Sequence, residues 1–146
     1  MSQRETFIRF VLELERSRVP YRWGGKRVDG IDCSGVVTLG LYLVGAPDVR
    51  ATANTDVLWT GLAPIEARDV RPGDLAFYGG SSADDVEHVM VVLDGGEVVG
   101  ASGGGRTTTT IARALEQGAR VKRYRSPTYR GDLRGYRRLP LPLEDS

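Results

Sequence analysis

The sequence has a single cysteine, Cys33, and a single histidine, His88, among its 146 residues. One cysteine excludes an intramolecular disulfide. A metal site built from cysteine and histidine would have two such ligands at most, so we expect no bound metal and no cofactor. The same scarcity means that a catalytic Cys–His pair can form in only one way.

Long apolar runs are also missing. No stretch of about 18 or more apolar residues occurs, which excludes a transmembrane helix, and we expect no insertion into a membrane. The N-terminus, Met1–Thr6, lacks the basic start, apolar core and small-residue cleavage site of a secretory signal. We therefore expect a protein that stays in the cytoplasm or leaves the cell by a route that needs no such signal.

The charges nearly cancel: the formal net charge is +1, with 27% charged and 40% apolar residues. This balance is typical of a soluble globular protein, and the length suits one domain over residues 1–146. Residues 120–138 depart from it, with eight basic residues opposed by Asp132 alone. We interpret this segment as a solvated basic surface; the alternative is attraction to an acidic polymer, such as the cell wall or a nucleic acid. No recognisable nucleic-acid motif accompanies it, so we expect no specific nucleic-acid partner.

Apolar periodicity predicts helices in the first half of the chain and strands in the second. The expected helices cover about 4–16, 34–44 and 56–59, with a helical turn at 112–117. The expected strands cover 75–78, 88–93, 97–101, 121–124 and 133–138. Helices packed on a mainly antiparallel sheet define the α+β class. Residues 139–146, with two prolines and an acidic end, are expected to form a tail.

Cys33 lies where a glycine-rich loop, residues 21–32, passes into an apolar helix. A lone cysteine is most often an inert buried residue, so its position decides its interpretation. The exposed N–H groups and the dipole of a helix N-terminus favour an anion, so a thiol there loses its proton more easily. Asp32 and Ser34 are good capping residues on either side. Cys33 is therefore a candidate nucleophile.

His88 opens the apolar strand 88–93, which would fix its backbone next to a helix packed on the sheet. A lone histidine at a strand start is more often structural than catalytic. Rigid placement opposite a helix N-terminus is nevertheless what a Cys–His pair requires. We expect His88 to act as the general base, with a thiolate–imidazolium pair as the resting form.

Three blocks of sequence resemble the NlpC/P60 family of cysteine peptidases. The first joins Tyr21–Gly25, YRWGG, to Gly30–Gly35, GIDCSG; the others are Arg71–Tyr78, RPGDLAFY, and His88–Val92, HVMVV. Their order and spacing agree with the family from about Pro20 to Ala101. The resemblance implies a papain-like fold and hydrolysis of peptide bonds in peptidoglycan stem peptides, between γ-D-glutamyl and diamino acid residues.

Carried over position by position, the resemblance makes Cys33 the nucleophile and His88 the general base and later the general acid. Tyr21 would line the site beside the cysteine. Asp32 would bind the amine end of the stem peptide, with Ser34 next to the nucleophile in the same site.

The sequence departs from the family pattern at the residue that orients the histidine. Family members usually carry His, Asn or Gln on the following strand, and counting through the hairpin puts this position at Gly100, which has no side chain. Ser102 would point to the same face of the strand and is the candidate substitute. A backbone carbonyl or a water is the alternative partner. Residues 101–110 lack the ending of a phosphate-binding P-loop and are interpreted as a loop beside the active site.

Two other functions stay open. The same Cys–His pair could serve an amidase or an acyltransferase that acts on other amides or lipids. The missing side chain at Gly100 could instead mark a wall- or tail-binding module whose catalysis has decayed, although Cys33, His88 and Tyr21 are all present. Small stand-alone members of the family occur in phage tails, so delivery with a phage-like particle, with particle proteins as partners, competes with a cytoplasmic role in wall recycling.

Overall fold

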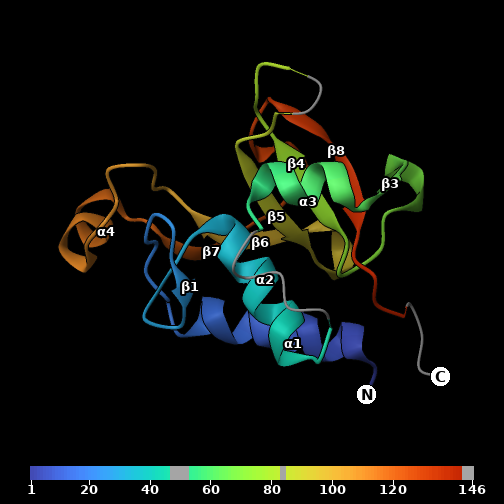
Figure 1. Cartoon of the computed structure of the whole chain (residues 1–146), viewed down its shortest axis with the longest axis horizontal. Coiled ribbons are helices and arrows are strands. Elements are labelled where there is room, and N and C mark those ends of the chain that lie inside the picture. The colour runs from blue at the N-terminus through green and yellow to red at the C-terminus, as the bar shows by residue number, and fades with distance from the viewer. Residues whose placement is uncertain (47–52, 83–84, 143–146) are drawn as a thin grey trace.

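A computed structural model describes residues 1–46, 53–82 and 85–142 of the chain (Figure 1). Its helices within these ranges are α1 (Gln3–Arg16), α2 (Cys33–Leu43), α3 (Thr55–Gly61) and α4 (Ile111–Gln117), with 3-10 turns η1 (Ala67–Asp69), η2 (Asp94–Gly96) and η3 (Pro127–Tyr129). Each helix was predicted to within a few residues. None of the described helices is long and apolar enough to cross a membrane.

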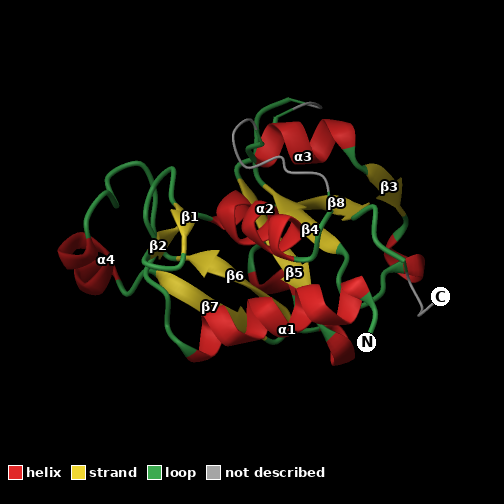
Figure 2. Ribbon diagram, turned by 60° about the horizontal axis from the view of Figure 1, so that its bottom comes forward, coloured by secondary structure: helices red, strands yellow, loops and turns green. Residues whose placement is uncertain are grey.

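The strands form one large sheet and one small ribbon in the described part of the chain. The large sheet is antiparallel throughout, in the order β3-β8-β4-β5-β6-β7. The ribbon pairs β1 with β2 inside the loop expected at 21–32. The α+β class is confirmed (Figure 2). The strands are β1 (Lys26–Arg27), β2 (Gly30–Ile31), β3 (Ala63–Ile65), β4 (Leu75–Tyr78), β5 (His88–Val92), β6 (Val98–Ser102), β7 (Arg120–Tyr124) and β8 (Leu133–Arg138).

Helices α1 and α2 pack on one side of the sheet, which we call the helix face (Figure 2). Phe7, Val11 and Leu14 recur at spacings of four and three and are buried, so α1 turns one apolar stripe to the sheet. A Cβ at Gly40 would lie 2.5 Å from the Phe7 ring, so this glycine lets α2 approach α1 closely. The strands contribute alternate side chains to the same core: Val89, Val91, Val99, Ala101 and Val121.

The opposite side of the sheet, which we call the tyrosine face, carries the other alternate side chains of the same strands. Its buried core is Ala76, Tyr78, Met90, Val92 and Val98. Aromatic side chains from β7, η3 and β8 pack against that core, among them Tyr124, Tyr129 and Tyr136. The last quarter of the chain therefore supplies much of the cover of this face.

Asp74, in the turn before β4, fastens both ends of the described chain to the sheet. It is fully buried and accepts hydrogen bonds from Arg4 Nη1 at 3.3 Å and Arg138 Nη2 at 2.9 Å. It also accepts the N–H of Arg71 at 2.7 Å, which closes the proline-glycine turn. Arg4 lies on α1 and Arg138 on β8. This aspartate therefore has a structural role that joins three elements.

Most arginines of the basic segment 120–138 contact other parts of the domain. Arg123 forms ion pairs with Glu15 at 2.7 Å and Glu97 at 3.1 Å. Arg137 lies 3.4 Å from the centroid of the Trp59 ring and donates to the Trp59 carbonyl. The remaining contacts join Arg130 to Asp132, Arg134 to the carbonyls of Gly79, Ser82 and Asp85, and Arg138 to Asp74. A solvated basic surface therefore describes only part of this segment, which fastens β7 and β8 to the domain.

Residues 139–142 are packed against the domain and do not form the expected tail. Leu139 and Leu141 are 2% and 6% exposed and belong to the core of the helix face. The carbonyls of Leu141 and Pro142 accept hydrogen bonds from Arg4. Two leucines at a spacing of two reach the same core, which outweighs the prolines between and after them. Residues 143–146 lie outside the described ranges.

Candidate active site

Cys33 is the first residue of α2, and the cap before it fixes its position. Asp32 has an extended backbone, and its Oδ1 accepts the Gly35 N–H at 2.7 Å, as an N-cap does. Its Oδ2 accepts the Gly24 N–H at 3.1 Å, which folds the glycine-rich loop back onto the helix. The Gly25 carbonyl comes so close that a Cβ at Gly35 would lie 2.3 Å from it. The thiol is thus held at a helix N-terminus, as the sequence predicted.

The two neighbours of Cys33 serve the cap in the free protein. Ser34 is 4% exposed and donates its hydroxyl proton to Asp32 Oδ1 at 3.1 Å. The Asp32 carboxylate accepts this bond together with two backbone N–H groups. Their contact with a stem peptide stays a prediction.

Burial opposes the effect of the helix N-terminus on the thiol. Cys33 is 7% exposed, and burial first and the Asp32 carboxylate second raise its pKa to about 12. The N–H of Val89 donates to the sulfur and acts in the other direction, but more weakly. In the free protein Cys33 is therefore a neutral thiol at physiological pH.

His88, the first residue of β5, is buried to the same extent and rests neutral as well. It is 7% exposed, and burial followed by the Arg130 charge lowers its pKa to about 4. Both pKa shifts favour uncharged side chains in the free protein, in place of the expected thiolate–imidazolium pair. Burial is the largest cause of both shifts, and it favours the uncharged form of each side chain.

Cys33 and His88 lie at the same end of β5. The sulfur accepts a hydrogen bond from Val89, the residue after His88, and a charge on Cys33 would raise the pKa of Tyr129. Tyr129 in turn contacts the imidazole: its Oη lies 2.9 Å from His88 Nε2. Since Nε2 contacts Tyr129, Nδ1 is the nitrogen available for the expected pairing with the sulfur. The direct exchange of a proton between the two side chains stays a prediction.

Gly100, to which the family resemblance assigns the orienting position, is not the residue directly opposite His88 on β6. The register of the β5–β6 pair, continued to the start of β5, places Ser102 opposite His88. Gly100 lies two residues away, where a Cβ would meet the Met90 sulfur at 2.8 Å.

The partner of the His88 ring is Tyr129, which the sequence analysis did not identify as a site residue. We expected Ser102, a backbone carbonyl or a water at this place. Ser102 lies one contact further away: its Oγ lies 3.1 Å from the hydroxyl of Tyr124, whose ring stacks on that of Tyr129. The available signal was the set of tyrosines interleaved with arginines after residue 120: Tyr124, Tyr129 and Tyr136.

Tyr21 lies beside the thiol, under the loop that follows β6. It is 5% exposed, and burial together with the charges of Cys33 and Asp32 raises its pKa. A Cβ at Gly104 would lie 2.6 Å from the Tyr21 ring, so the glycine lets the loop rest on the tyrosine. The loop at 101–110 therefore borders the candidate site, as the sequence suggested.

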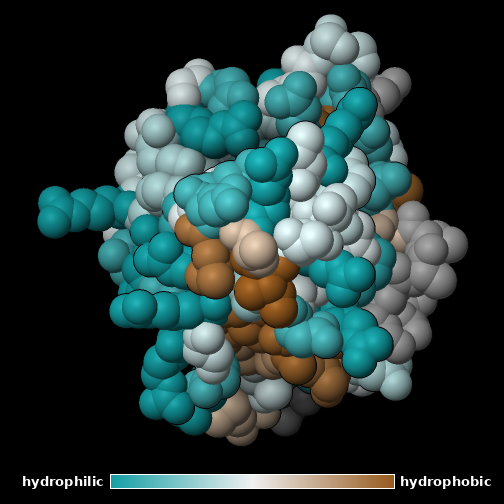
Figure 3. Space-filling view, turned by 90° about the vertical axis from the view of Figure 1, so that its left-hand side faces the viewer, coloured by the Kyte–Doolittle hydropathy of each residue, from teal (hydrophilic) through white to brown (hydrophobic). Residues whose placement is uncertain are grey.

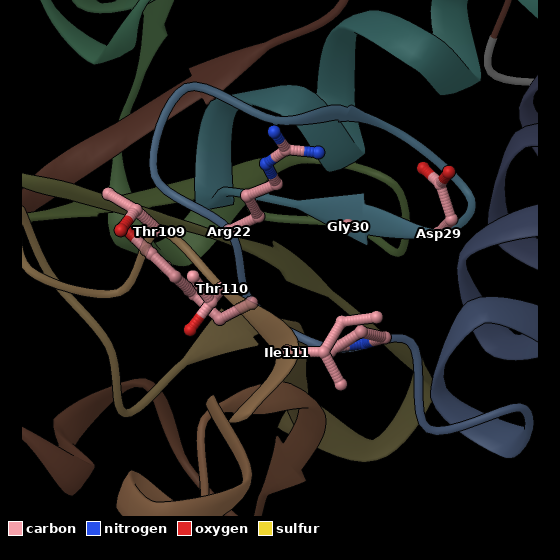
Figure 4. Close-up of a pocket in the computed structure, with 8 residues that line it drawn as sticks. Arg22, Asp29, Gly30, Thr109, Thr110 and Ile111 are labelled. Atoms are coloured by element: carbon pink, nitrogen blue, oxygen red, sulfur yellow. The ribbon is translucent and has the colours of Figure 1, made fainter. Parts of the chain in front are cut away.

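A pocket of about 250 Å³ opens next to Tyr21 (Figure 4). Arg22 and Asp29 lie in the upper part of the view, and Ile111 lies in the lower part, below Thr110. The pocket therefore offers a cation, a carboxylate and hydroxyl groups beside the candidate site. Helix α4 continues its wall and exposes 59% of Ile111 and 76% of Leu115. Apolar surface gathers between polar margins on the side of the molecule where α4 lies (Figure 3).

A cysteine at a helix N-terminus beside a histidine at a strand start is the arrangement of a cysteine hydrolase. The chain belongs to the NlpC/P60 family, whose model matches residues 18–133. Murein DD-endopeptidase MepH of Escherichia coli is 33% identical over 81 residues, which cover 55% of this chain and 30% of that protein. This chain thus spans less than a third of the length of MepH.

Solved structures of the family share the fold. An NlpC/P60 family protein from Bacillus cereus has a TM-score of 0.71 at 19% identity, covering 92% of this chain and 39% of that one. RipD of Mycobacterium tuberculosis, described as a non-catalytic NlpC/P60 domain protein adapted to peptidoglycan binding, has a TM-score of 0.67 at 18% identity. That match covers 97% of this chain and 99% of RipD. The family thus contains both hydrolases and binding proteins.

Proposed function

We propose that the chain is a cysteine endopeptidase that hydrolyses peptide bonds in peptidoglycan stem peptides, with Cys33 as nucleophile and His88 as base. One observation carries the proposal: the only thiol lies at the N-terminus of α2 against the N–H that follows the only histidine. Membership of a family whose curated relatives are named endopeptidases supplies the substrate class.

The proposed reaction starts with Cys33 and His88 both uncharged. The sulfur attacks the carbonyl carbon of the scissile bond, and its proton passes to His88 Nδ1 as the S–C bond forms. The imidazolium then gives this proton to the leaving amine, and the C–N bond breaks. Water, deprotonated by the same nitrogen, hydrolyses the thioester and restores the thiol. Because both groups rest uncharged, proton transfer accompanies the attack and does not precede it.

The bond within the stem peptide has two candidates. The family resemblance favours the bond between γ-D-glutamyl and diamino acid residues, while the name of MepH specifies a DD-endopeptidase. We propose the γ-D-glutamyl bond. Asp32 for an amine and the pocket with Arg22 and Asp29 beside Tyr21 support a subsite that binds a charged peptide end close to the nucleophile.

Digestion of defined muropeptides, followed by mass spectrometry, tests both the activity and the bond. Wild-type protein should release products whose new amine and carboxyl ends identify the bond, and Cys33→Ala should release none while keeping the fold. Full turnover by Cys33→Ala would contradict the proposal. Products from a lipid or another amide in place of muropeptides would favour the amidase or acyltransferase alternative.

The second candidate function is binding without cleavage. The similarity to RipD favours it, as does the raised pKa of Cys33. Sedimentation with purified sacculi separates the two. A protein that binds sacculi equally well as wild type and Cys33→Ala, and cleaves no muropeptide, would be a binding module.

Delivery with a phage-like particle is a separate proposal that rests on the resemblance to small phage-tail members of the family. Mass spectrometry of purified particles from the source organism should detect the chain together with tail proteins. Its detection only in the cytosolic fraction would favour a role in wall recycling.

A further inference from the structure

The His88 ring is held by the tyrosine face of the sheet, through a row of hydroxyl groups. Tyr129 Oη lies 2.9 Å from His88 Nε2, the Ser102 hydroxyl lies close enough to Tyr129 to lower its pKa, and Ser102 Oγ lies 3.1 Å from Tyr124 Oη. Three side chains on three segments thus connect the buried imidazole to the partly exposed hydroxyl of Tyr124. The row contacts the ring at Nε2, which leaves Nδ1 for the proposed transfer of the Cys33 proton.

Packing fixes Tyr129 in this place independently of its hydroxyl group. Its ring stacks on Tyr124, with centroids 3.9 Å apart and planes 6° from parallel, and meets the Tyr78 ring edge-on at 5.5 Å. The backbone is held by η3, where Ser126 accepts the N–H of Thr128 at 3.1 Å. Removal of the hydroxyl alone should therefore leave the ring where it is.

The direction of the hydrogen bonds decides whether His88 can act as a base. A hydroxyl can both donate and accept, so Tyr129 alone does not choose the tautomer. To take the Cys33 proton, Nδ1 must be bare, which requires the proton on Nε2 and Tyr129 as its acceptor. Tyr129 must then donate to Ser102, and Ser102 to Tyr124. Tyr129 and Ser102 would each accept one bond and donate one, and Tyr124 would accept the last, so the row can satisfy this requirement.

We propose that Tyr129 is the positioning residue that holds His88 as the Nε2–H tautomer, with Ser102 and Tyr124 fixing the direction of its hydroxyl group. This takes the place of the side chain that family members carry on the strand after the histidine. The inference deepens the proposed function and rests on it for the catalytic consequence. The tautomer itself is a property of the free protein.

Two readouts test the proposal without any substrate, because the chain has one histidine and one cysteine. The two ring ¹⁵N shifts of His88 in the full chain report the tautomer, and iodoacetamide alkylation reports the reactivity of Cys33. We expect Nε2–H in wild type, a mixture of tautomers in Tyr129→Phe and a smaller shift of the same kind in Ser102→Ala. Alkylation near pH 7 should slow roughly 10-fold in Tyr129→Phe, since the base is then less often in the form that accepts the thiol proton.

Turnover on muropeptides adds a third readout. Tyr129→Phe should lower kcat about 10- to 100-fold with KM nearly unchanged, less than the about 10⁴-fold that a wrong tautomer costs in serine proteases, because Tyr129 carries no charge. Tyr78→Phe is the matched control, since it removes a neighbouring buried hydroxyl outside the row, and it should leave the ¹⁵N shifts unchanged.

Unchanged ¹⁵N shifts in a folded Tyr129→Phe would overturn the proposal, as would a wild-type ring protonated on Nδ1. If wild type cleaves no muropeptide but Tyr129→Phe still loses the Nε2–H preference, the proposed function fails and the positioning role of Tyr129 stands.

Discussion

The helix face and the tyrosine face of the sheet each hold half of the candidate site, and they are built by different means. The nucleophile is set by local contacts: Asp32 caps the helix one residue before Cys33, and the loop it folds back is eight residues away at Gly24. The base is set by distant contacts, because Tyr129 lies 41 residues after His88. The difference shows that a short signature can place a thiol, while the environment of its base depends on the whole fold.

The two faces also differ in polarity. The core of the helix face is mostly aliphatic, and Cys33 lies at its border. The tyrosine face surrounds His88 with phenol rings and their hydroxyl groups, and Arg130 lies 5.6 Å from the centroid of Tyr78. Both environments keep their titratable group neutral, but only the tyrosine face offers hydrogen bonds that can fix a tautomer.

Both faces of the sheet keep their cover only while α1 and β8 are attached to the turn before β4, and Asp74 makes these attachments. Its replacement should therefore have the largest effect on stability. Asp74→Ala removes a fully buried carboxylate and leaves Arg4, 4% exposed, without its ion pair. We expect a loss of about 3–5 kcal/mol in the free energy of unfolding, measured by urea denaturation, because an unpaired buried charge is costly. Glu13→Ala breaks the exposed pair with Arg16 and should cost less than about 1 kcal/mol. Equal losses would contradict a structural role for Asp74.

Acidification should destabilise the tyrosine face through His88. Its pKa falls from 6.5 in the unfolded chain to about 4 in the fold, so between these values the unfolded chain binds a proton that the folded protein does not. Stability is therefore full above pH 6.5 and falls by about 3 kcal/mol as the pH drops to about 4. Unfolding curves at several pH values would measure this. His88→Gln should show a shallower decline, and an unchanged decline in that variant would assign the effect to other groups.

Much of the fold and half of the site could be predicted from the sequence. The contrast between local and distant contacts explains why. The helices and main strands follow from apolar periodicity, and Cys33 from the glycine-rich loop that ends at a helix. Tyr129 could not be placed, because no local pattern indicates which tyrosine after residue 120 reaches a ring on β5. The role of Gly100 could not be judged from the sequence, because the residue opposite His88 depends on the register of the hairpin, which places Ser102 there. Leu139 and Leu141 were assigned to a tail because prolines and charges surround them.

Two glycines, one on each face of the sheet, should differ by a smaller amount in the stability that is lost on substitution. A Cβ at Gly35 on the helix face would lie 2.3 Å from the Gly25 carbonyl, which is backbone and cannot move without the loop. A Cβ at Gly100 on the tyrosine face would meet the Met90 sulfur, which belongs to a flexible side chain, at 2.8 Å, and the Val89 carbonyl oxygen at 3.3 Å. Gly35→Ala should therefore cost about 2–3 kcal/mol and Gly100→Ala about 1 kcal/mol or less, by thermal denaturation.

Gly100 can also be used to test which residue positions His88 in the candidate site. Gly100→Asn should not raise turnover, because Gly100 lies opposite Met90 and the His88 ring already has Tyr129 as its partner. A gain of activity in Gly100→Asn would show that a side chain on β6 can replace Tyr129. Greater destabilisation by Gly100→Ala than by Gly35→Ala would contradict the difference in packing.

The smallest effect is expected at Tyr78, whose hydroxyl has no hydrogen-bond partner in the described part of the chain although it is buried. A buried hydroxyl without a partner has lost its bonds to water and gained none, so its removal should be neutral or stabilise by about 1 kcal/mol. The Tyr78 ring still packs against His88 and Tyr129, with centroids 5.6 and 5.5 Å away, and phenylalanine preserves these contacts. Tyr78→Phe should thus keep the melting temperature and turnover of wild type. Tyr129→Phe, which removes the same atom from a ring 5.5 Å away, should lose turnover. Equal losses in both variants would mean that the tyrosine face acts on His88 through packing alone, and the hydroxyl row would have no special role.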